Sequence, residues 1–270
     1  ETDPGLPDLH GMYWSSSNDF TEAMYYRLAQ AVSFSNSFIK NASELSGDEV
    51  NVFIAEARFL RAYAYYNLLD LYGNVPLTTE ISTELPTQSN RTELFNFIES
   101  ELMEIESTLL ASNEYGRVDN IAAHALLSRL YLNAEAWTGQ DRYADCVTYS
   151  QNVINSGYSL NMNDANGNGT AYDELFMADN DVNGAQNEFI FTLNFDGMQS
   201  QTYGGTTFLV HAAIGGSMNP GNFGVNGGWG GLRTTKNLVN QFAVDLDVLN
   251  SSLGSQSDWG LVGSATPNGW

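Results

Sequence analysis

The sequence has little cysteine and no long apolar run. Its single cysteine, Cys146, excludes an internal disulfide and any metal site built from several thiolates. No run of about 18 apolar residues occurs, so the sequence predicts no transmembrane helix. Residues 1–11 lack the basic and apolar regions of a signal peptide, which indicates either a cytosolic protein or a trimmed piece of an exported one.

Positive charge is also scarce. Ten Lys and Arg residues stand against 32 Asp and Glu residues, which gives a formal net charge of −22. This charge repels polyanions, so nucleic acid is not expected as a partner. Because only 16% of the residues are charged, much of the polar surface must come from Asn, Gln, Ser, Thr and Gly. Their neutral donors and acceptors suit hydroxyl-rich ligands.

Recognisable catalytic motifs are missing. The three histidines, His10, His124 and His211, are far apart in sequence, and none belongs to an H-E-x-x-H pair. Neither the G-x-S-x-G turn of hydrolases nor a phosphate-binding P-loop occurs. The histidines are therefore interpreted as residues of the surface or the edge of the core, and Cys146 as a small buried hydrophobe.

What the sequence does contain is helical periodicity. Apolar residues spaced by three and four predict a helix over Asp48–Tyr72, stopped by Gly73 and Pro76. Three further helices are predicted: one capped by Thr92 and running to about Ala111, one capped by Asp119 and running through Ala136, and one from Asp141 to Ser156–Gly157. They form two helical hairpins, of which the second resembles a tetratricopeptide-type repeat, and stacked hairpins predict a mainly α scaffold over residues 1–160.

Charged side chains on these helices have two interpretations. Arg58 and Arg61 lie three residues apart, and we expect them to bind carboxylates or carbonyl groups of neighbouring helices and so to hold the scaffold. A run of glutamates marks the polar face of the next helix: Glu99, Glu101, Glu104 and Glu106. We interpret it as a solvated face rather than as paired catalytic carboxylates.

The composition changes after residue 160. Residues 161–270 are rich in Asn, Asp and Gly and predict a loop-rich region with little β structure. Within it, the alternating apolar residues of "NEFIFTLNF" (187–195) predict a strand, and Thr234 or Thr235 is expected to cap a short helix. The predicted domains are thus a helical scaffold, 1–160, and a loop-rich region, 161–270.

One loop suggests a metal. Asp164, Asn166 and Asn168, followed by Gly169, match the first half of a calcium loop, D-x-N-x-N-G, in which oxygen atoms at alternate positions converge on the ion. The twelfth position is Leu175 instead of the usual bidentate glutamate. A plain Asn/Gly turn is therefore the favoured alternative, and calcium is the one cofactor that the sequence suggests.

Two aromatic residues lie in glycine-rich loops. Tyr203 precedes Gly204 and Gly205, and Trp229 lies between Gly228 and Gly230. Each ring is either packed in the core or exposed, and an exposed ring can lie against the apolar face of a sugar. From these residues alone, core packing is favoured over ligand contact.

Several long motifs resemble those of one family. The segments "AEARFLRAYAYYNLLDLYGNVPL" (55–77), "RTELFNFIESELMEIE" (91–106), residues 116–160 and "DELFMADND" (173–181) resemble the SusD/RagB family. "TYGGTTFLV" (202–210) and "NGGWGGLRTTKNLVNQF" (226–242) are similar to its starch-binding SusD branch in particular. The resemblance covers most of residues 6–243, in order.

The resemblance implies a protein without catalytic activity or a required cofactor. Family members are nutrient-binding lipoproteins of the outer-membrane surface in Bacteroidota, and they deliver glycan to a SusC-like TonB-dependent transporter. The starch-binding branch implies α-glucan as the ligand, with Tyr203 and Trp229 as glycan-binding residues, because they match the tyrosine of N-Y-G-G and the tryptophan of N-G-W. It also implies a membrane link only through an N-terminal lipid anchor that this chain lacks, and a chain truncated relative to the family.

Three alternatives stay open. A helical-repeat adaptor would bind a protein partner through the scaffold, and a SusD-like protein could bind a different glycan. A glycoside hydrolase would need two carboxylates across the sugar. Asp196 is the only acidic residue between Asn194 and Asp245, so this third alternative has little support.

Overall fold

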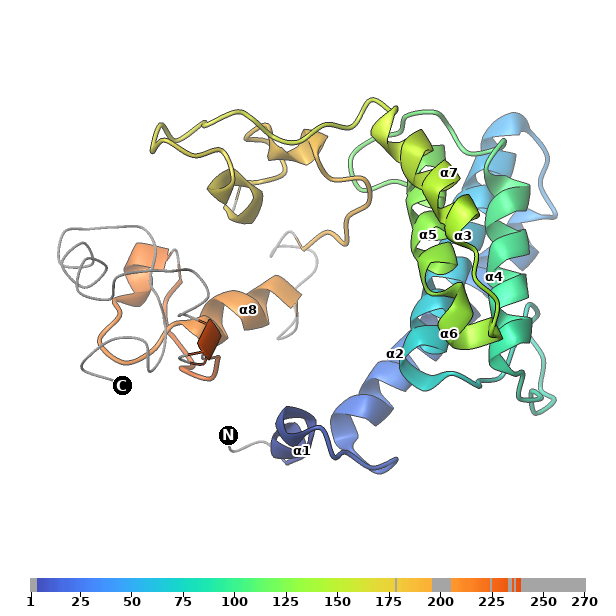
Figure 1. The fold of residues 1–270 in the computed structure, drawn as a ribbon, viewed down its shortest axis with the longest axis horizontal. Coiled ribbons are helices and arrows are strands. Elements are labelled where there is room, and N and C mark those ends of the chain that lie inside the picture. Colours follow the sequence, from blue (N-terminus) through green and yellow to red (C-terminus); the bar gives the residue numbers. More distant parts are fainter. Residues whose placement is uncertain are drawn as a thin grey trace. The chain divides into compact units, whose positions relative to one another are not determined.

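The computed structural model describes residues 4–177, 179–195, 205–223, 225–232, 235, 237 and 238. The chain divides into two compact units, Thr2–Leu193 and Asn194–Trp270, here called the helical unit and the C-terminal unit. Figure 1 shows that the regular elements of the described residues are helices. Strand-like pairing in this part of the chain is limited to one isolated bridge, between Pro76 and Gln88.

The helical unit contains seven α-helices among its described residues: α1 Leu6–Gly11, α2 Asp19–Ala42, α3 Asp48–Tyr72, α4 Arg91–Ile105, α5 Asn120–Leu132, α6 Ala134–Thr138 and α7 Tyr143–Ile154. Helix α3 packs against α2 and α4, and α5 packs against α7 (Figure 1). The predicted mainly α scaffold of tetratricopeptide-like helical pairs is confirmed. None of the described helices is long and apolar enough to cross a bilayer.

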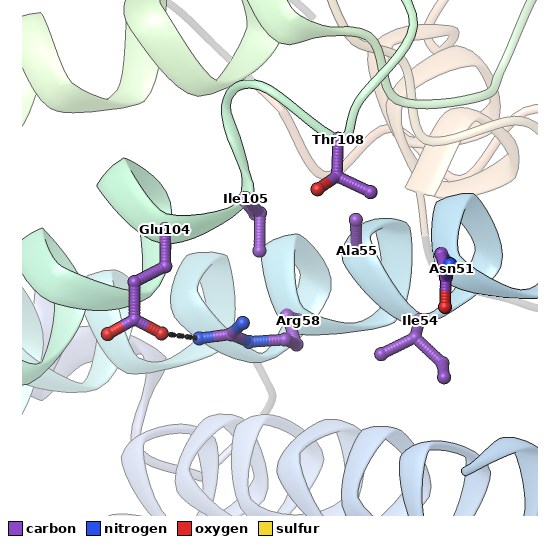
Figure 2. Close-up of a pocket in the computed structure, with 7 residues that line it drawn as sticks. All are labelled: Asn51, Ile54, Ala55, Arg58, Glu104, Ile105 and Thr108. Carbon is purple, nitrogen blue, oxygen red and sulfur yellow. Dashed lines mark hydrogen bonds and ion pairs between the residues drawn. The ribbon is translucent and has the colours of Figure 1, made fainter. Parts of the chain in front are cut away.

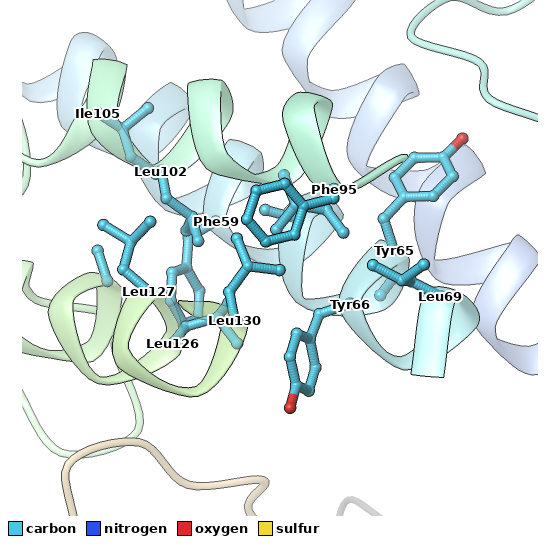
Figure 3. Packing of buried hydrophobic residues seen from close by; sticks show 14 of the residues in the cluster. Phe59, Tyr65, Tyr66, Leu69, Phe95, Leu102, Ile105, Leu126, Leu127 and Leu130 are labelled. Atoms are coloured by element: carbon cyan, nitrogen blue, oxygen red, sulfur yellow. The ribbon is translucent and has the colours of Figure 1, made fainter. Parts of the chain in front are cut away.

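The core of this unit lies between α3, α4 and α5 (Figure 3). Its largest buried side chains include Phe59, Leu94, Leu102, Leu127 and Leu130. Two neighbouring apolar stripes run along α3. Phe59 lies on the stripe with Ala62 and Tyr66 and is buried, whereas Leu60 and Leu71 lie on the other stripe and are exposed. A helix with partners on several sides buries more than one stripe, so spacing alone did not tell which stripe faces the centre.

Helix α2 was not predicted from the sequence. The Asn18 side chain accepts hydrogen bonds from the backbone N–H groups of Phe20 and Thr21, which is N-capping geometry. Tyr25, Leu28 and Val32 face the core at helical spacing. The cap and this spacing are the sequence signals that could have identified the helix.

Helix α4 differs from its predicted bounds. It begins after Asn90, whose side chain accepts from the N–H of Glu93 while the Glu93 carboxylate accepts from the N–H of Asn90. This reciprocal capping box satisfies two N–H groups that the helix leaves unbonded, so Asn90 and not Thr92 is the cap. The helix ends at Ile105 rather than near Ala111.

The next helices confirm one predicted cap and contradict another. Asp119 caps α5, because its Oδ1 accepts from the backbone N–H of Ala122 at 2.9 Å. The helix ends at Leu132, and the short α6 follows instead of a continuous helix through Ala136. Helix α7 has Arg142 at its N-cap position with no side-chain cap, so Asp141 does not start it.

The strand predicted over 187–195 is absent, and its described residues form a short 3-10 helix and loop. Phe191 packs instead against α3, with its ring 5.2 Å from that of Phe59 and 5.6 Å from that of Tyr63. A strand needs a neighbour to pair its backbone groups, and the described residues provide none here. The compact helical unit thus includes this segment and extends to Leu193, and the division into domains 1–160 and 161–270 stays a prediction.

Candidate functional site

Arg58 and Arg61 hold α3 to α4, as expected from the sequence. Arg61 is buried, and its Nε and Nη2 donate to Oε2 of Glu101 at 3.1 and 2.5 Å, while its Nη1 donates to Oδ1 of Asn36 at 2.8 Å. Nη2 of Arg58 donates to Oε1 of Glu101 and to Oε2 of Glu104, both at 2.6 Å. The buried carboxylate of Glu101 thus joins α4 to two guanidinium groups of α3. The bond from Arg61 to Asn36 extends this link to α2.

A shallow cavity of about 250 Å³ lies beside Arg58 (Figure 2). Its lining comes from α3 and from the end of α4 and the turn that follows: Asn51, Ile54, Ala55, Arg58, Glu104, Ile105 and Thr108. Figure 2 shows that Arg58, its one cationic lining residue, is joined to Glu104. Since that charge is already paired, the cavity offers no strong recognition group and we assign it no ligand.

The glutamates of α4 are only partly a solvated face: Glu104 is exposed, as interpreted, but for Glu99 and Glu101 that interpretation was wrong. Glu101 is buried between the arginines, and Oε1 of Glu99 accepts from the hydroxyl of Tyr131 and from Nη2 of Arg142, both at 2.8 Å. Burial and the hydrogen bond to Glu99 raise the pKa of Tyr131. Each of these contacts joins α4 to another segment, so the acidic side chains serve the scaffold.

The predicted histidine and cysteine roles are broadly met. His10 is exposed at the end of α1. His124 lies on α5 at the edge of the core, with its Nε2 3.5 Å from Oε2 of Glu106. Cys146 is half-buried and packs against the core. None of these contacts builds a nucleophile with a base.

The suggested calcium loop is closed by its own hydrogen bonds. The carboxylate of Asp164 accepts three backbone N–H groups, from Gly167 (2.8 Å), Asn168 (3.1 Å) and Gly169 (2.8 Å). These are Asx-type bonds that stabilise a tight turn without an ion. The loop therefore has the geometry of the Asn/Gly turn that the sequence left open as an alternative.

The two asparagines of this loop face an anion. Their Nδ2 groups donate to Oδ2 of the buried Asp173, from Asn166 at 2.9 Å and from Asn168 at 2.6 Å. The bond from Asn166 is the main reason that the pKa of Asp173 is lowered. A cation would need the opposite amide orientation, with oxygen atoms inward. In the described part of the chain, no three His, Cys, Asp or Glu side chains are grouped to hold a metal, and calcium stays a prediction.

The other predicted site lies in the C-terminal unit. Tyr203 is outside the described residues. Trp229 is described, and its backbone runs along the last turn of α8, Gly205–Ala213. Three backbone N–H groups of this segment donate to carbonyl oxygens at the end of the helix: Trp229 to His211 (2.7 Å), Gly230 to Ile214 (2.8 Å) and Leu232 to Ala212 (2.8 Å). The last carbonyl groups of a helix lack intrahelical partners, so these bonds give them donors and fix the loop; the carbonyl of His211 also accepts from the N–H of Ile214 at 3.3 Å.

The tryptophan side chain is half exposed and is surrounded by rings. Trp229 has 45% of its surface exposed. The imidazole of His211 is stacked on it, with centroids 4.9 Å apart and planes 29° apart. Phe208, also exposed, has its ring 6.3 Å away and tilted by 56°. The sequence had not indicated Phe208 or His211, although both lie on α8 at a spacing of three, on one face of the helix.

The residue before the tryptophan admits no side chain. A Cβ atom on Gly228 would lie 2.3 Å from the carbonyl oxygen of Ile214. Only glycine allows the loop to approach the end of α8 this closely. The glycine flanking Trp229 thus serves the close approach of two backbones.

A hydrogen bond near the end of the described chain agrees with the cap predicted at Thr234 or Thr235. The backbone N–H of Leu238 donates to Oγ1 of Thr235 at 3.2 Å, which is the geometry of an N-cap. Thr235 is thus one of the two caps that were expected. The other, Thr234, lies outside the described residues.

Comparison with known proteins identifies the family. Residues 10–132 match a family model described as "Starch-binding associating with outer membrane". The starch-binding protein SusD of Bacteroides thetaiotaomicron is 36% identical over 245 residues, which make up 90% of this chain and 43% of that protein. The chain is SusD-like. The resemblance inferred from its motifs is confirmed.

Solved structures agree with a SusD-like fold. A SusD-like protein from Bacteroides fragilis superposes with a TM-score of 0.57 and 25% identity, over 68% of this chain and 35% of that one. A structure solved with a xylogluco-oligosaccharide superposes with a TM-score of 0.60 and 24% identity, over 68% and 37%. The chain spans less than half the length of the curated relatives it matches.

Proposed function

We propose that this SusD-like chain binds α-glucan, such as starch or a malto-oligosaccharide, through Trp229 and without catalysis. The observation that carries the proposal is Trp229 itself, a residue that is 45% exposed and lies in a loop fixed by three backbone hydrogen bonds. An exposed ring on a fixed support can lie against the apolar face of a sugar. The related SusD of Bacteroides thetaiotaomicron is named as a starch-binding protein, which supports the choice of glycan.

Ring geometry supports a curved ligand. Phe208 and Trp229 are both exposed, and their planes are tilted by 56° instead of being coplanar. An extended β-linked glucan is flat and would match coplanar rings, whereas an α-linked chain turns from one sugar to the next. The tilted pair therefore favours the curved chain.

The described residues around the rings are neutral. In the described residues of the C-terminal unit there is no Asp, Glu, Lys or Arg side chain. These residues offer ring contact and neutral hydrogen bonds for recognition, and salt does not screen either of them. We expect weak binding that is insensitive to ionic strength.

The likeness to SusD also supports a proposal for the cellular role. We propose that the protein is a surface-exposed lipoprotein of the outer membrane and delivers glycan to a SusC-like TonB-dependent transporter. The description of the matched family model, which associates it with the outer membrane, supports the location. Tyr203 is proposed as a second glycan contact on the strength of its match to the N-Y-G-G motif.

A second candidate function is that of a protein-binding adaptor. Helix α2 exposes four large apolar side chains whose spacings of four, ten and four residues place them on one face: Phe20, Met24, Phe34 and Phe38. Exposed apolar surface of this kind often contacts another protein surface. This function would not depend on Trp229, so the two candidates are separable. The shared fold of the xyloglucan-related structure also keeps a different glycan as an alternative, because the fold does not select the sugar.

A titration with matched variants tests the proposal. Maltoheptaose is titrated into the wild-type chain and into Trp229→Ala, with Trp14→Ala as the control because Trp14 is 47% exposed but lies in the helical unit. Removing an aromatic side chain at the centre of a site costs about tenfold or more in affinity. We expect this loss for Trp229→Ala and no change for Trp14→Ala. Equal binding by all three proteins, or equal binding of cello-oligosaccharide, would contradict the proposal.

A further inference from the structure

His211 and Trp229 contact each other through both their backbones and their side chains. The backbone N–H of Trp229 donates to the carbonyl oxygen of His211 at 2.7 Å, and the two side-chain rings are stacked at 4.9 Å. No such double link joins Trp229 to Phe208, whose ring is farther away and strongly tilted. The position of the indole is thus tied to one residue of α8.

The imidazole of His211 is itself anchored. Its Nδ1 lies 3.0 Å from the carbonyl oxygen of Thr207, one turn earlier on α8. A carbonyl oxygen only accepts hydrogen bonds, so Nδ1 carries the proton and donates. This bond fixes both the tautomer and the plane of the imidazole. The ring against which the indole stacks therefore has a defined orientation.

We infer that His211 is a positioning residue for Trp229. Its anchored imidazole holds the indole in the orientation that contacts the sugar, and so raises the affinity for glycan. The inference rests on the proposed function of Trp229. The stacked imidazole restricts the side-chain rotamers of the half-exposed indole, so that binding has fewer rotamers to select from. Avoiding the ordering of one such side chain is worth about two- to tenfold in affinity.

Two substitutions separate the ring from its anchor. His211→Asn keeps a donor near Nδ1, because its Nδ2 can reach the carbonyl of Thr207, but it has no ring. His211→Phe keeps a ring for stacking but has no donor. If stacking positions the indole, His211→Asn lowers the affinity for maltoheptaose about two- to tenfold, and His211→Phe retains most of it. Thermal melting of each variant checks that the fold is unchanged.

A second readout needs no ligand. The chain is labelled with 5-fluorotryptophan, and the ¹⁹F resonance of Trp229 is assigned by its absence in Trp229→Phe. The stacked ring displaces this resonance, so we expect it to shift in His211→Asn and to stay displaced in His211→Phe. An unchanged resonance in His211→Asn would overturn the inference, as would equal affinities of His211→Asn and the wild type.

The two readouts distinguish this inference from the proposed function. If the wild-type chain does not bind maltoheptaose, the proposed function fails, while the ¹⁹F spectra still decide whether His211 positions the indole. If the wild type binds and His211→Asn binds equally well, the function stands and the positioning role is refuted.

Discussion

Glu101 provides the strongest test of how the helical unit is held together. Its carboxylate binds Arg61 through Oε2 at 2.5 Å and Arg58 through Oε1 at 2.6 Å. The side chains of Glu101 and Arg61 are only 8% and 6% exposed. Glu101→Gln keeps the size of the side chain but removes the negative charge, and it places an amide donor near one of the guanidinium groups.

The expected cost follows from burial. Removing one partner of a buried ion pair leaves a charge without compensation and costs about 3–5 kcal/mol. Glutamine still offers one oxygen acceptor, so we expect the lower end, about 3 kcal/mol, in the free energy of unfolding. For a unit of this size, each kcal/mol shifts the melting temperature by about 2–4 °C, so the expected drop is about 6–12 °C.

Glu104 supplies a matched control. It binds the same Nη2 atom of Arg58 at the same 2.6 Å, but its side chain is 64% exposed. Ion pairs at such exposure contribute about 0–1 kcal/mol, so Glu104→Gln should change stability by less than 1 kcal/mol. Thermal and urea unfolding, followed by circular dichroism at 222 nm, measures both variants. The reasoning fails if the two substitutions cost the same, or if Glu101→Gln costs less than about 1 kcal/mol.

Two further predictions concern the helical unit. Burial and the bond to Glu99 raise the pKa of Tyr131, so the folded state keeps the phenol proton where the unfolded chain, with a pKa of about 10, releases it. The free energy of unfolding should therefore fall as pH rises above about 10. Urea titrations from pH 8 to 11 should show a smaller fall for Tyr131→Phe than for the wild type. An equal fall in the two proteins would contradict this. Asn90→Ala breaks the capping box of α4 and should lower the free energy of unfolding, measured in urea, by about 1 kcal/mol. Asn90→Ser keeps a capping oxygen and should retain most of the wild-type stability. Wild-type stability of Asn90→Ala would show that the cap contributes nothing.

Local signals in the sequence predicted the helices of the scaffold better than the helix ends and the contacts between helices. The periodicity of 48–72 predicted α3 because one long helix with apolar stripes leaves few alternatives. The start of α4 was misplaced because Asn90 and Thr92 are both good caps, and only the contact with Glu93 decides between them. The glutamates of α4 were misinterpreted for a related reason, since Arg61 lies 40 residues from Glu101 and periodicity does not show distant partners.

The candidate site was only partly predictable. Trp229 was identified by its motif, because local composition could not separate an exposed ring from a buried one. Phe208 and His211 were missed because their contacts with the indole depend on the loop that returns to α8, a tertiary feature. The strand over 187–195 was wrong because alternation reports which side chains are apolar and not what they pack against.

Gly228 restricts how sequences of this type can be compared. A side chain there would collide with the Ile214 carbonyl, so the loop could not follow its present path. A homologue that keeps the tryptophan but carries a larger residue in front of it must aim its indole elsewhere. Sugar preference should therefore be transferred between such proteins only when the glycine and the tryptophan occur together.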